Sequence, residues 1–195
     1  MTSTAARLQV IAGPMFSGKS EELLRRVRRA MIAGLAVEVV NHALDDRHGT
    51  AEISSHAGQR LSSTPVADSA GLLEVTRGRT LDLLAIDEAQ FFGPDLVPAI
   101  EELLRRCATV VISGLCVTYD ARPFEPLPSL MAVAEDVTKL TAVCHVCGAD
   151  APFHQRIHDL GVGDARTPEP AHVGGAETYQ ARCRRHLDRR GLPEG

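Results

Sequence analysis

The sequence has no long apolar run and no excess of positive charge. No apolar stretch among its 195 residues approaches the roughly 20 residues that a membrane-spanning helix needs. The first residues, MTSTAAR, lack the apolar core of a signal peptide. The net charge is −4, and no basic stripe marks a nucleic-acid-binding surface. We therefore expect a cytoplasmic protein whose partners include neither a membrane nor a nucleic acid.

Cysteine and lysine are also scarce. In a protein expected in the cytoplasm, the five cysteines fit free thiols or metal ligands better than disulfides. Lys19 and Lys139 are the only lysines, so a lysine at the required position of a binding motif argues against a chance match. Hydrophobic residues make up 44% of the chain and charged residues 24%, which is ordinary for a soluble globular protein.

Residues 13–20, GPMFSGKS, fit the pattern G-x-x-x-x-G-K-[ST] of a phosphate-binding loop, or P loop. The apolar run at residues 8–12 predicts a buried strand before it, and apolar residues at helical spacing follow it. Such a unit directs backbone N–H groups and the positive end of a helix dipole at a phosphate. We expect Lys19 to reach the β- and γ-phosphates of ATP and Ser20 to hold Mg²⁺. The predicted ATP-binding residues are Gly13, Pro14, Met15, Phe16, Ser17, Gly18, Lys19 and Ser20.

A second strand-like run, LDLLAIDE at residues 81–88, ends in two acids. Beside a P loop, the first acid of such a pair usually holds Mg²⁺, so we assign Asp87 to the metal. Residues 37–41 and 109–113 also predict strands, and residues 66–77 and 94–106 predict helices. Strands that alternate with helices predict an α/β fold of the P-loop NTPase type, with a parallel sheet covered by helices on both faces.

Residues 42–65 are rich in polar residues and predict a loop or an exposed hairpin. Asp45, Asp46 and Arg47 stand at the end of the second strand. They could be active-site groups or part of a solvated loop, and this stretch alone favours the solvated loop.

Two short knuckles near the end of the chain predict a metal site. Cys144 and Cys147 are separated by two residues, as are Cys183 and His186. Two such pairs complete a tetrahedral zinc site, and four protein ligands make it structural, because no open position remains. Four other histidines in this region are expected to be bystanders in knuckle or loop: His145, His154, His158 and His172.

Together these segments resemble the type II thymidine kinases, the cellular, bacterial and poxviral class. The likeness rests on residues 13–20, on IDEAQFF at residues 86–92, on LTAVC at residues 140–144 with Cys147, and on GGA at residues 174–176 with Tyr179 and Cys183. It runs from Leu8 to His186. The resemblance implies a kinase domain at residues 1–140, a zinc-ribbon-like domain at residues 141–190 with a lasso loop over the nucleoside, and a tail at residues 191–195.

The resemblance also implies roles for particular residues. Glu88 matches the base that receives the proton of the substrate 5′-hydroxyl, and Asp87 matches the magnesium-associated aspartate. Gln90, in the same segment, is expected to support ATP binding or catalysis, and Asp45 and Arg47 match an Asp-x-Arg sequence. Because Asp87 and Glu88 are adjacent at a strand end, we expect their side chains to leave on opposite faces. The implied nucleoside-binding residues are Met15, Phe91, Leu115, Tyr119, Phe124, Val173, Gly175 and Tyr179.

Three features depart from the family pattern. His186 replaces a cysteine of the animal members, which leaves a normal zinc ligand in place. Tyr119 stands where many members have phenylalanine, so its hydroxyl needs a partner beside the base. Cys116 and Val117 also differ from the usual residues.

The predicted reaction is transfer of the γ-phosphoryl group of ATP to thymidine or deoxyuridine, which gives dTMP in nucleotide salvage. The resemblance further implies a homotetramer and feedback inhibition by dTTP. One alternative is a P-loop ATPase whose zinc ribbon binds nucleic acid, and the negative charge argues against it. Another is a P-loop regulatory switch that does not transfer a phosphoryl group. This alternative leaves Glu88, beside Asp87, without a role.

Overall fold

The computed structural model describes residues 6–44, 52–54, 60–157 and 177–188. Its largest sheet has six strands: β1 (Arg7–Gly13), β2 (Val37–His42), β5 (Thr64–Val66), β6 (Leu81–Asp87), β7 (Cys107–Leu115) and β8 (Asp136–Lys139). The helices are α1 (Lys19–Ile32), α2 (Ser69–Val75), α3 (Leu96–Leu104), α4 (Leu127–Val133) and the 3₁₀ turn η1 (Ala89–Phe92). Among the described residues, no helix has the length and apolar content to cross a membrane.

The main sheet is parallel throughout. Its strand order is β5-β2-β6-β7-β1-β8, and every adjacent pair runs in the same direction. The loop after β1 and the acidic end of β6 therefore lie at the same edge of the sheet, where ligands of open α/β folds bind.

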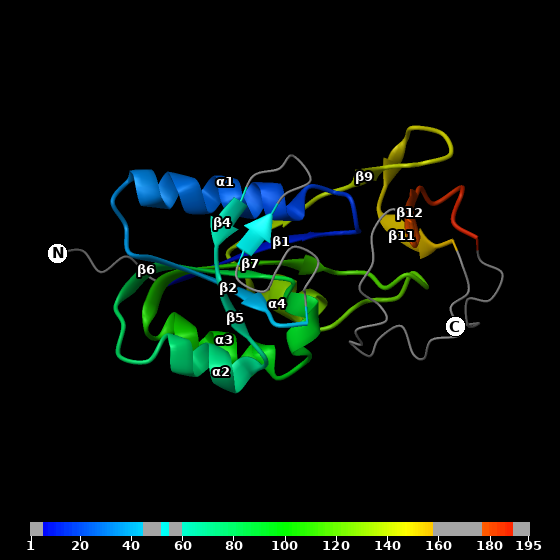
Figure 1. The fold of residues 1–195 in the computed structure, drawn as a ribbon. Coiled ribbons are helices and arrows are strands. Elements are labelled where there is room, and N and C mark those ends of the chain that lie inside the picture. The colour runs from blue at the N-terminus through cyan, green and yellow to red at the C-terminus, as the bar shows by residue number, and fades with distance from the viewer. Residues whose placement is uncertain (1–5, 45–51, 55–59, 158–176, 189–195) are drawn as a thin grey trace.

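Helices cover both faces of this sheet, as the alternating pattern predicts. Helix α1 lies on one face, and α2, α3 and α4 lie on the other (Figure 1). Side chains of β1 alternate between the two cores: Val10 is buried with the α2–α4 layer, whereas Ile11 is buried against α1. Fully buried Leu23, Leu24 and Val27 form the apolar face of α1, so tertiary packing holds this helix in place.

Two expected helices are shorter in the structure than the sequence predicts. Val66 belongs to β5, because it pairs with His42 of β2, so the expected helix at residues 66–77 shortens to α2. That helix begins at Ser69 because the Asp68 carboxylate accepts a hydrogen bond from the Gly71 N–H at 2.7 Å. The helix expected at residues 94–106 is α3, two residues shorter at each end. The expected hairpin is present as β3 (Glu52–Ser54) paired with β4 (Arg60–Ser62).

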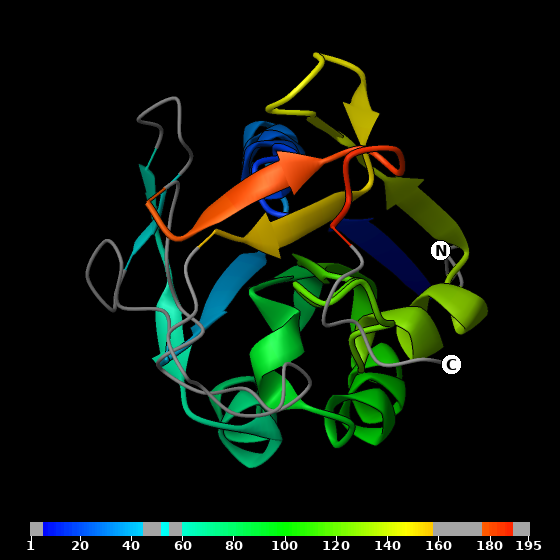
Figure 2. The same ribbon diagram turned by 90° about the vertical axis from the view of Figure 1, so that its right-hand side faces the viewer.

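After β8 the chain forms a small second module of two antiparallel pairs. β9 (Ala142–Val143) pairs with β10 (Asp150–Ala151), and β11 (Phe153–Arg156) pairs with β12 (Tyr179–Arg182). The module has its own apolar cluster, which includes Ala142, Ala151 and Ala181. Figures 1 and 2 show β11 and β12 lying at the sheet edge that carries the loop after β1.

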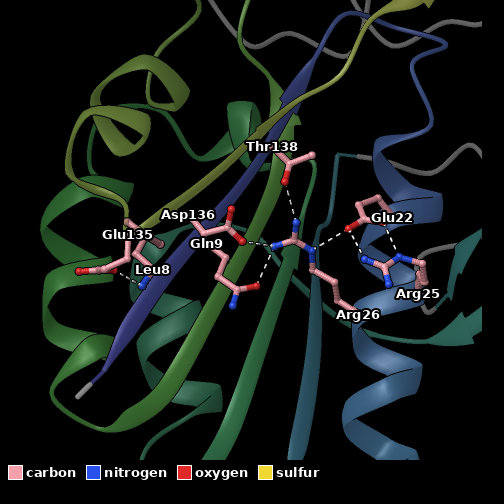
Figure 3. Close-up of polar contacts among 8 residues, drawn as sticks. All are labelled: Leu8, Gln9, Glu22, Arg25, Arg26, Glu135, Asp136 and Thr138. Atoms are coloured by element: carbon pink, nitrogen blue, oxygen red, sulfur yellow. Dashed lines mark hydrogen bonds and ion pairs between the residues drawn. The ribbon is translucent and has the colours of Figure 1, made fainter. Parts of the chain in front are cut away.

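Arg26 ties α1 to the edge of the sheet (Figure 3). Its guanidinium donates to Gln9 of β1 at 2.7 Å, and to Asp136 and Thr138 of β8 at 3.1 and 2.8 Å. Its Nε also donates to Glu22 one turn earlier at 2.9 Å. Only 13% of the Arg26 side chain is exposed, so water screens these contacts less than it screens a surface ion pair.

We predict that Arg26→Ala lowers the free energy of unfolding by about 2 to 4 kcal/mol, because it leaves partly buried polar groups without their donor. Arg25→Ala is the matched control. Arg25 also binds Glu22, but its side chain is 57% exposed, so its loss should lower the stability much less than the loss of Arg26. Urea denaturation of the two variants measures both values. Equal losses would contradict a structural role for the buried network.

Candidate functional site

The P loop follows β1 and is held by contacts within itself. The Lys19 ammonium donates to the Pro14 carbonyl at 2.6 Å, and the Ser17 hydroxyl donates to the same oxygen at 2.9 Å. Gly18 has φ 81°, a left-handed conformation that favours glycine, and it stands just before the first residue of α1. At Gly13 a Cβ atom would lie 2.6 Å from Ser17 Oγ and 2.9 Å from the Leu140 carbonyl, so only glycine fits there.

Asp87 ends β6 and is buried beside the P loop. Its carboxylate accepts a hydrogen bond from the Glu88 N–H at 3.0 Å, and the nearby Ser20 hydroxyl favours its ionised form. The Ser113 hydroxyl lies close enough to favour the ionised form, yet it has no partner with hydrogen-bond geometry among the described residues. Burial, and then the charge of Glu88, raise the pKa of Asp87 to about 6.

Glu88 does not continue the strand. Its backbone is left-handed, with φ 52° and ψ 41°, and it precedes η1. Strand alternation therefore does not set the direction of the Glu88 side chain, and the expectation that the two acids leave on opposite faces stays a prediction.

Gln90 connects Glu88 to the neighbouring strand. It is fully buried, and its amide N–H donates to Glu88 Oε2. Its amide oxygen accepts from the Leu115 N–H, at the end of β7, at 2.9 Å. The buried Gln90 side chain thus fixes the position of the Glu88 carboxylate relative to the end of β7.

The donor atoms at this edge suit a magnesium ion. Mg²⁺ prefers oxygen ligands and keeps several waters, so it is usually bound by one or two protein groups together with substrate phosphates. The Asp87 carboxylate and the Ser20 hydroxyl lie close together, and the buried Ser113 hydroxyl beside them finds no hydrogen-bond partner in the described part of the chain. A cation would offset both the burial and the Glu88 charge that raise the pKa of Asp87.

The expected nucleoside-binding residues that the structure describes come from the P loop, η1, the end of β7, the connection from β7 to α4, and β12. Tyr179 is buried, and its ring centroid lies 6.4 Å from that of Tyr119. Phe91 and Leu115 flank the Gln90 bridge, and Phe91 lies 5.8 Å from the buried ring of His42. Phe124 is buried on the connection between β7 and α4. The Met15 N–H points toward the second module, where it meets His154 Nδ1 at 3.5 Å.

His154, Arg156 and His42 were not expected at the site. His154 is not among the four clustered zinc ligands, as expected, but it lies on β11 and is 2% exposed, so its expected place in a loop is corrected. The Arg156 guanidinium stacks 4.1 Å above the Tyr119 ring and donates to the Tyr179 hydroxyl at 3.3 Å. His42 ends β2 and packs edge-on against Phe92 at 4.6 Å. The sequence carried no signal for them beyond their place in short, uneven strands.

The second module gathers the four predicted zinc ligands. The ligand atoms of Cys144, Cys147, Cys183 and His186 all lie within 4.8 Å of one another. Cys147 Sγ lies 3.8 Å from Cys183 Sγ, and Cys183 Sγ lies 3.2 Å from His186 Nδ1. His145 is exposed and stays outside the group, as expected.

Both the spacing and the chemistry of this cluster fit zinc. A tetrahedral ion with Zn–S bonds of about 2.3 Å separates two sulfur atoms by about 3.8 Å. Burial opposes ionisation of the Cys144 thiol, but three backbone N–H groups outweigh it and lower the pKa to about 5. The thiolate is the form that binds metal.

Four expected site residues lie outside the described residues. They are Asp45 and Arg47, after β2, and Val173 and Gly175, before β12. Their roles stay predictions. His158 and His172 also lie outside the described residues, so their assignment as loop histidines stays a prediction too.

Comparisons with known proteins agree with the motifs. The family model "Thymidine kinase" matches residues 6–187. A thymidine kinase of Deinococcus deserti is 44% identical over 193 residues, which cover 94% of this chain and 95% of that protein. A thymidine kinase of Halobacterium salinarum is 46% identical, with the same coverage of both chains.

The raised pKa of Asp87 predicts a stability change with pH. Between its ordinary value of 3.8 and about 6, the folded protein binds more protons than the unfolded chain, so the free energy of unfolding falls as pH rises. Asp87→Asn removes this ionisation. We compare the free energies of unfolding of the variant and the wild type without magnesium or nucleotide. The difference, variant minus wild type, should be about 2 to 3 kcal/mol larger at pH 8 than at pH 4.

Asp95→Asn is the control for this experiment, because Asp95 is exposed and its side chain caps no helix. Urea denaturation at pH 4, 6 and 8 measures the free energy of unfolding of the wild type, Asp87→Asn and Asp95→Asn. A stability difference for Asp87→Asn that does not change with pH would contradict the assignment.

Proposed function

The chain belongs to the thymidine kinase family, and from this premise we propose that it transfers the γ-phosphoryl group of ATP to the 5′-hydroxyl of thymidine or deoxyuridine. The observation that carries the proposal is the meeting of three parts at one sheet edge: the P loop, the buried Asp87 and the partly exposed Glu88 that follows it. Phosphoryl transfer needs little covalent chemistry from a protein, so positioning and charge neutralisation suffice.

On the donor side, the backbone N–H groups of residues 13–20 and the start of α1 would hold the phosphates. Lys19 now donates to the Pro14 carbonyl from inside the loop, so its ammonium is within reach of a phosphate held there. Asp87 and Ser20 would hold Mg²⁺, which supplies neutralisation of the phosphate charge.

On the acceptor side, Glu88 would receive the proton of the 5′-hydroxyl. As the hydroxyl oxygen bonds to the γ-phosphorus, the bond between that phosphorus and the β,γ-bridging oxygen breaks, and ADP leaves. The proton passes to the Glu88 carboxylate and then to water. Gln90 supports this role, because its amide N–H donates to Glu88 Oε2 and so orients the carboxylate.

The base would lie among Met15, Phe91, Leu115, Tyr119, Phe124 and Tyr179. Backbone groups near Val173 and Gly175 would pair with its polar edge, in a lasso loop that excludes water from the reaction. A site built to pair buried polar groups rejects a base whose edge does not match. Asp45 and Arg47 would assist on the ATP side.

We further propose one structural zinc ion per chain, bound by Cys144, Cys147, Cys183 and His186, in a domain at residues 141–190 beside a kinase domain at residues 1–140. Homotetramer formation and inhibition by dTTP rest on the family resemblance, and a cytoplasmic location rests on the composition of the sequence. The exposed side chains of Met31 and Ile32 at the end of α1 are compatible with assembly.

An assay of labelled ATP against nucleosides tests the reaction. Thymidine and deoxyuridine should yield labelled 5′-monophosphates, whereas deoxyguanosine and deoxyadenosine should yield little. ATP hydrolysis stimulated by DNA, without a labelled nucleotide product, would support the nucleic-acid-binding ATPase instead.

We predict that Glu88→Gln lowers kcat by about two to four powers of ten, because the amide cannot accept the proton. Thymidine affinity should change little, since the amide can still bind the hydroxyl. Glu74→Gln is the control, because that side chain is 64% exposed on α2 and forms a surface ion pair with Arg77. Steady-state kinetics and equilibrium binding on both variants separate the effects. Unchanged turnover in Glu88→Gln would remove this residue from the mechanism.

Zinc content gives an independent prediction. Cys183→Ser should lose most of the bound zinc, because a serine hydroxyl is a poor substitute for a thiolate ligand. Cys107→Ser should keep one zinc per chain, because Cys107 is buried in the sheet away from the cluster. Elemental analysis of the purified proteins measures both. Equal zinc in the two variants would exclude the proposed site.

A further inference from the structure

The P loop contacts the second module through two consecutive residues. Phe16 has φ 66°, which is strained for a residue with a side chain. Its ring packs against the apolar cluster that contains Ala142, Ala151 and Ala181. The neighbouring Met15 N–H meets His154 Nδ1. A strained loop conformation persists only where its surroundings hold it, and here part of those surroundings belongs to the second module.

His154 connects this contact to Tyr179. Its ring meets that of Tyr179 edge-on, with centroids 5.7 Å apart, across the β11–β12 pair. Arg156, two residues along the same strand face, holds the Tyr179 hydroxyl. One strand therefore touches the loop expected to bind the donor phosphates and the aromatic ring expected to cover the acceptor base.

We propose that His154 is a positioning residue that braces the P loop against Tyr179 and thereby couples the binding of the phosphoryl donor to that of the nucleoside. The part that concerns the nucleoside rests on the proposed function. The part that concerns the P loop does not, because it needs only the contacts that Met15 and Phe16 of the loop make with the second module.

The chemistry of the imidazole suits a permanent brace. An Nδ1 atom that accepts from the Met15 N–H requires the neutral tautomer with its proton on Nε2. Burial, and then the charge of Lys19, lower the pKa of His154 to about 3. The ring therefore remains an acceptor throughout the neutral range. The 3.5 Å contact is long, so its value lies in fixing the direction of the Met15 N–H more than in its strength.

Two substitutions separate the functions of the ring. His154→Phe keeps an aromatic ring beside Tyr179 but has no acceptor for Met15. His154→Asn loses the ring but places an amide oxygen close to the position of Nδ1. His145→Phe and His145→Asn are the matched controls, because His145 is an exposed histidine of the same module.

The readout is calorimetric titration of the zinc-loaded proteins with a magnesium complex of a non-hydrolysable ATP analogue, with and without thymidine. His154→Phe should weaken binding of the analogue alone by about 5- to 20-fold, and thymidine should no longer tighten it. His154→Asn should keep most of the affinity for the analogue alone. The His145 variants should match the wild type in both arms.

Wild-type affinity and wild-type coupling in His154→Phe would overturn the proposal. A wild type that binds thymidine without any change in analogue affinity would overturn the coupling. A wild type that binds no thymidine would contradict the proposed function instead, and the titration without nucleoside would still decide the brace.

One measurement needs no variant, in case His154→Phe fails to fold. Nitrogen-15 NMR of the histidine rings at pH 7 should show His154 as the neutral tautomer with its proton on Nε2. A proton on Nδ1, or a charged ring, would exclude acceptance from Met15 and with it the brace.

Discussion

Parallel pairing of β1 with β7 and of β7 with β6 is the constraint on which the site depends. Gly13 stands opposite Leu115, and Ile86 stands opposite Ile112, so three strands end within a few residues of one another. This register places the P loop, the buried Asp87 and the Gln90 bridge at one edge. A one-residue shift of β6 would send Asp87 to the opposite face of the sheet and away from Ser20.

Several features of the site lower the stability of the folded protein. A carboxylate buried at Asp87 ionises with difficulty, and two residues with side chains, Phe16 and Glu88, adopt left-handed conformations. Each of these is unfavourable in isolation and is held by its neighbours. The buried Gln90 supports Glu88, and the apolar cluster of the second module supports Phe16. In this account the second module stabilises the kinase site as well as covering it.

The parts of the site that local spacing defines could be predicted from the sequence. The P loop, the acidic end of β6 and the zinc knuckles each need particular residues a few positions apart, and the alternation of strands and helices gave the fold class. Contacts between distant segments could not be predicted in this way. Met15 and His154 are 139 residues apart, and no period or motif relates them. Likewise, Val66 joined β5 because a neighbouring strand was available, which its local helical pattern does not reveal.

The central claim is that donor and acceptor meet between the P loop and the β11–β12 pair, with Glu88 at the reacting hydroxyl. A crystal structure of the protein with magnesium, ADP and thymidine tests this most directly. We expect the β-phosphate within residues 13–20 and the thymidine 5′-hydroxyl within hydrogen-bond distance of the Glu88 carboxylate. A nucleoside bound away from Tyr179, or a 5′-hydroxyl that no Glu88 oxygen can reach, would contradict it.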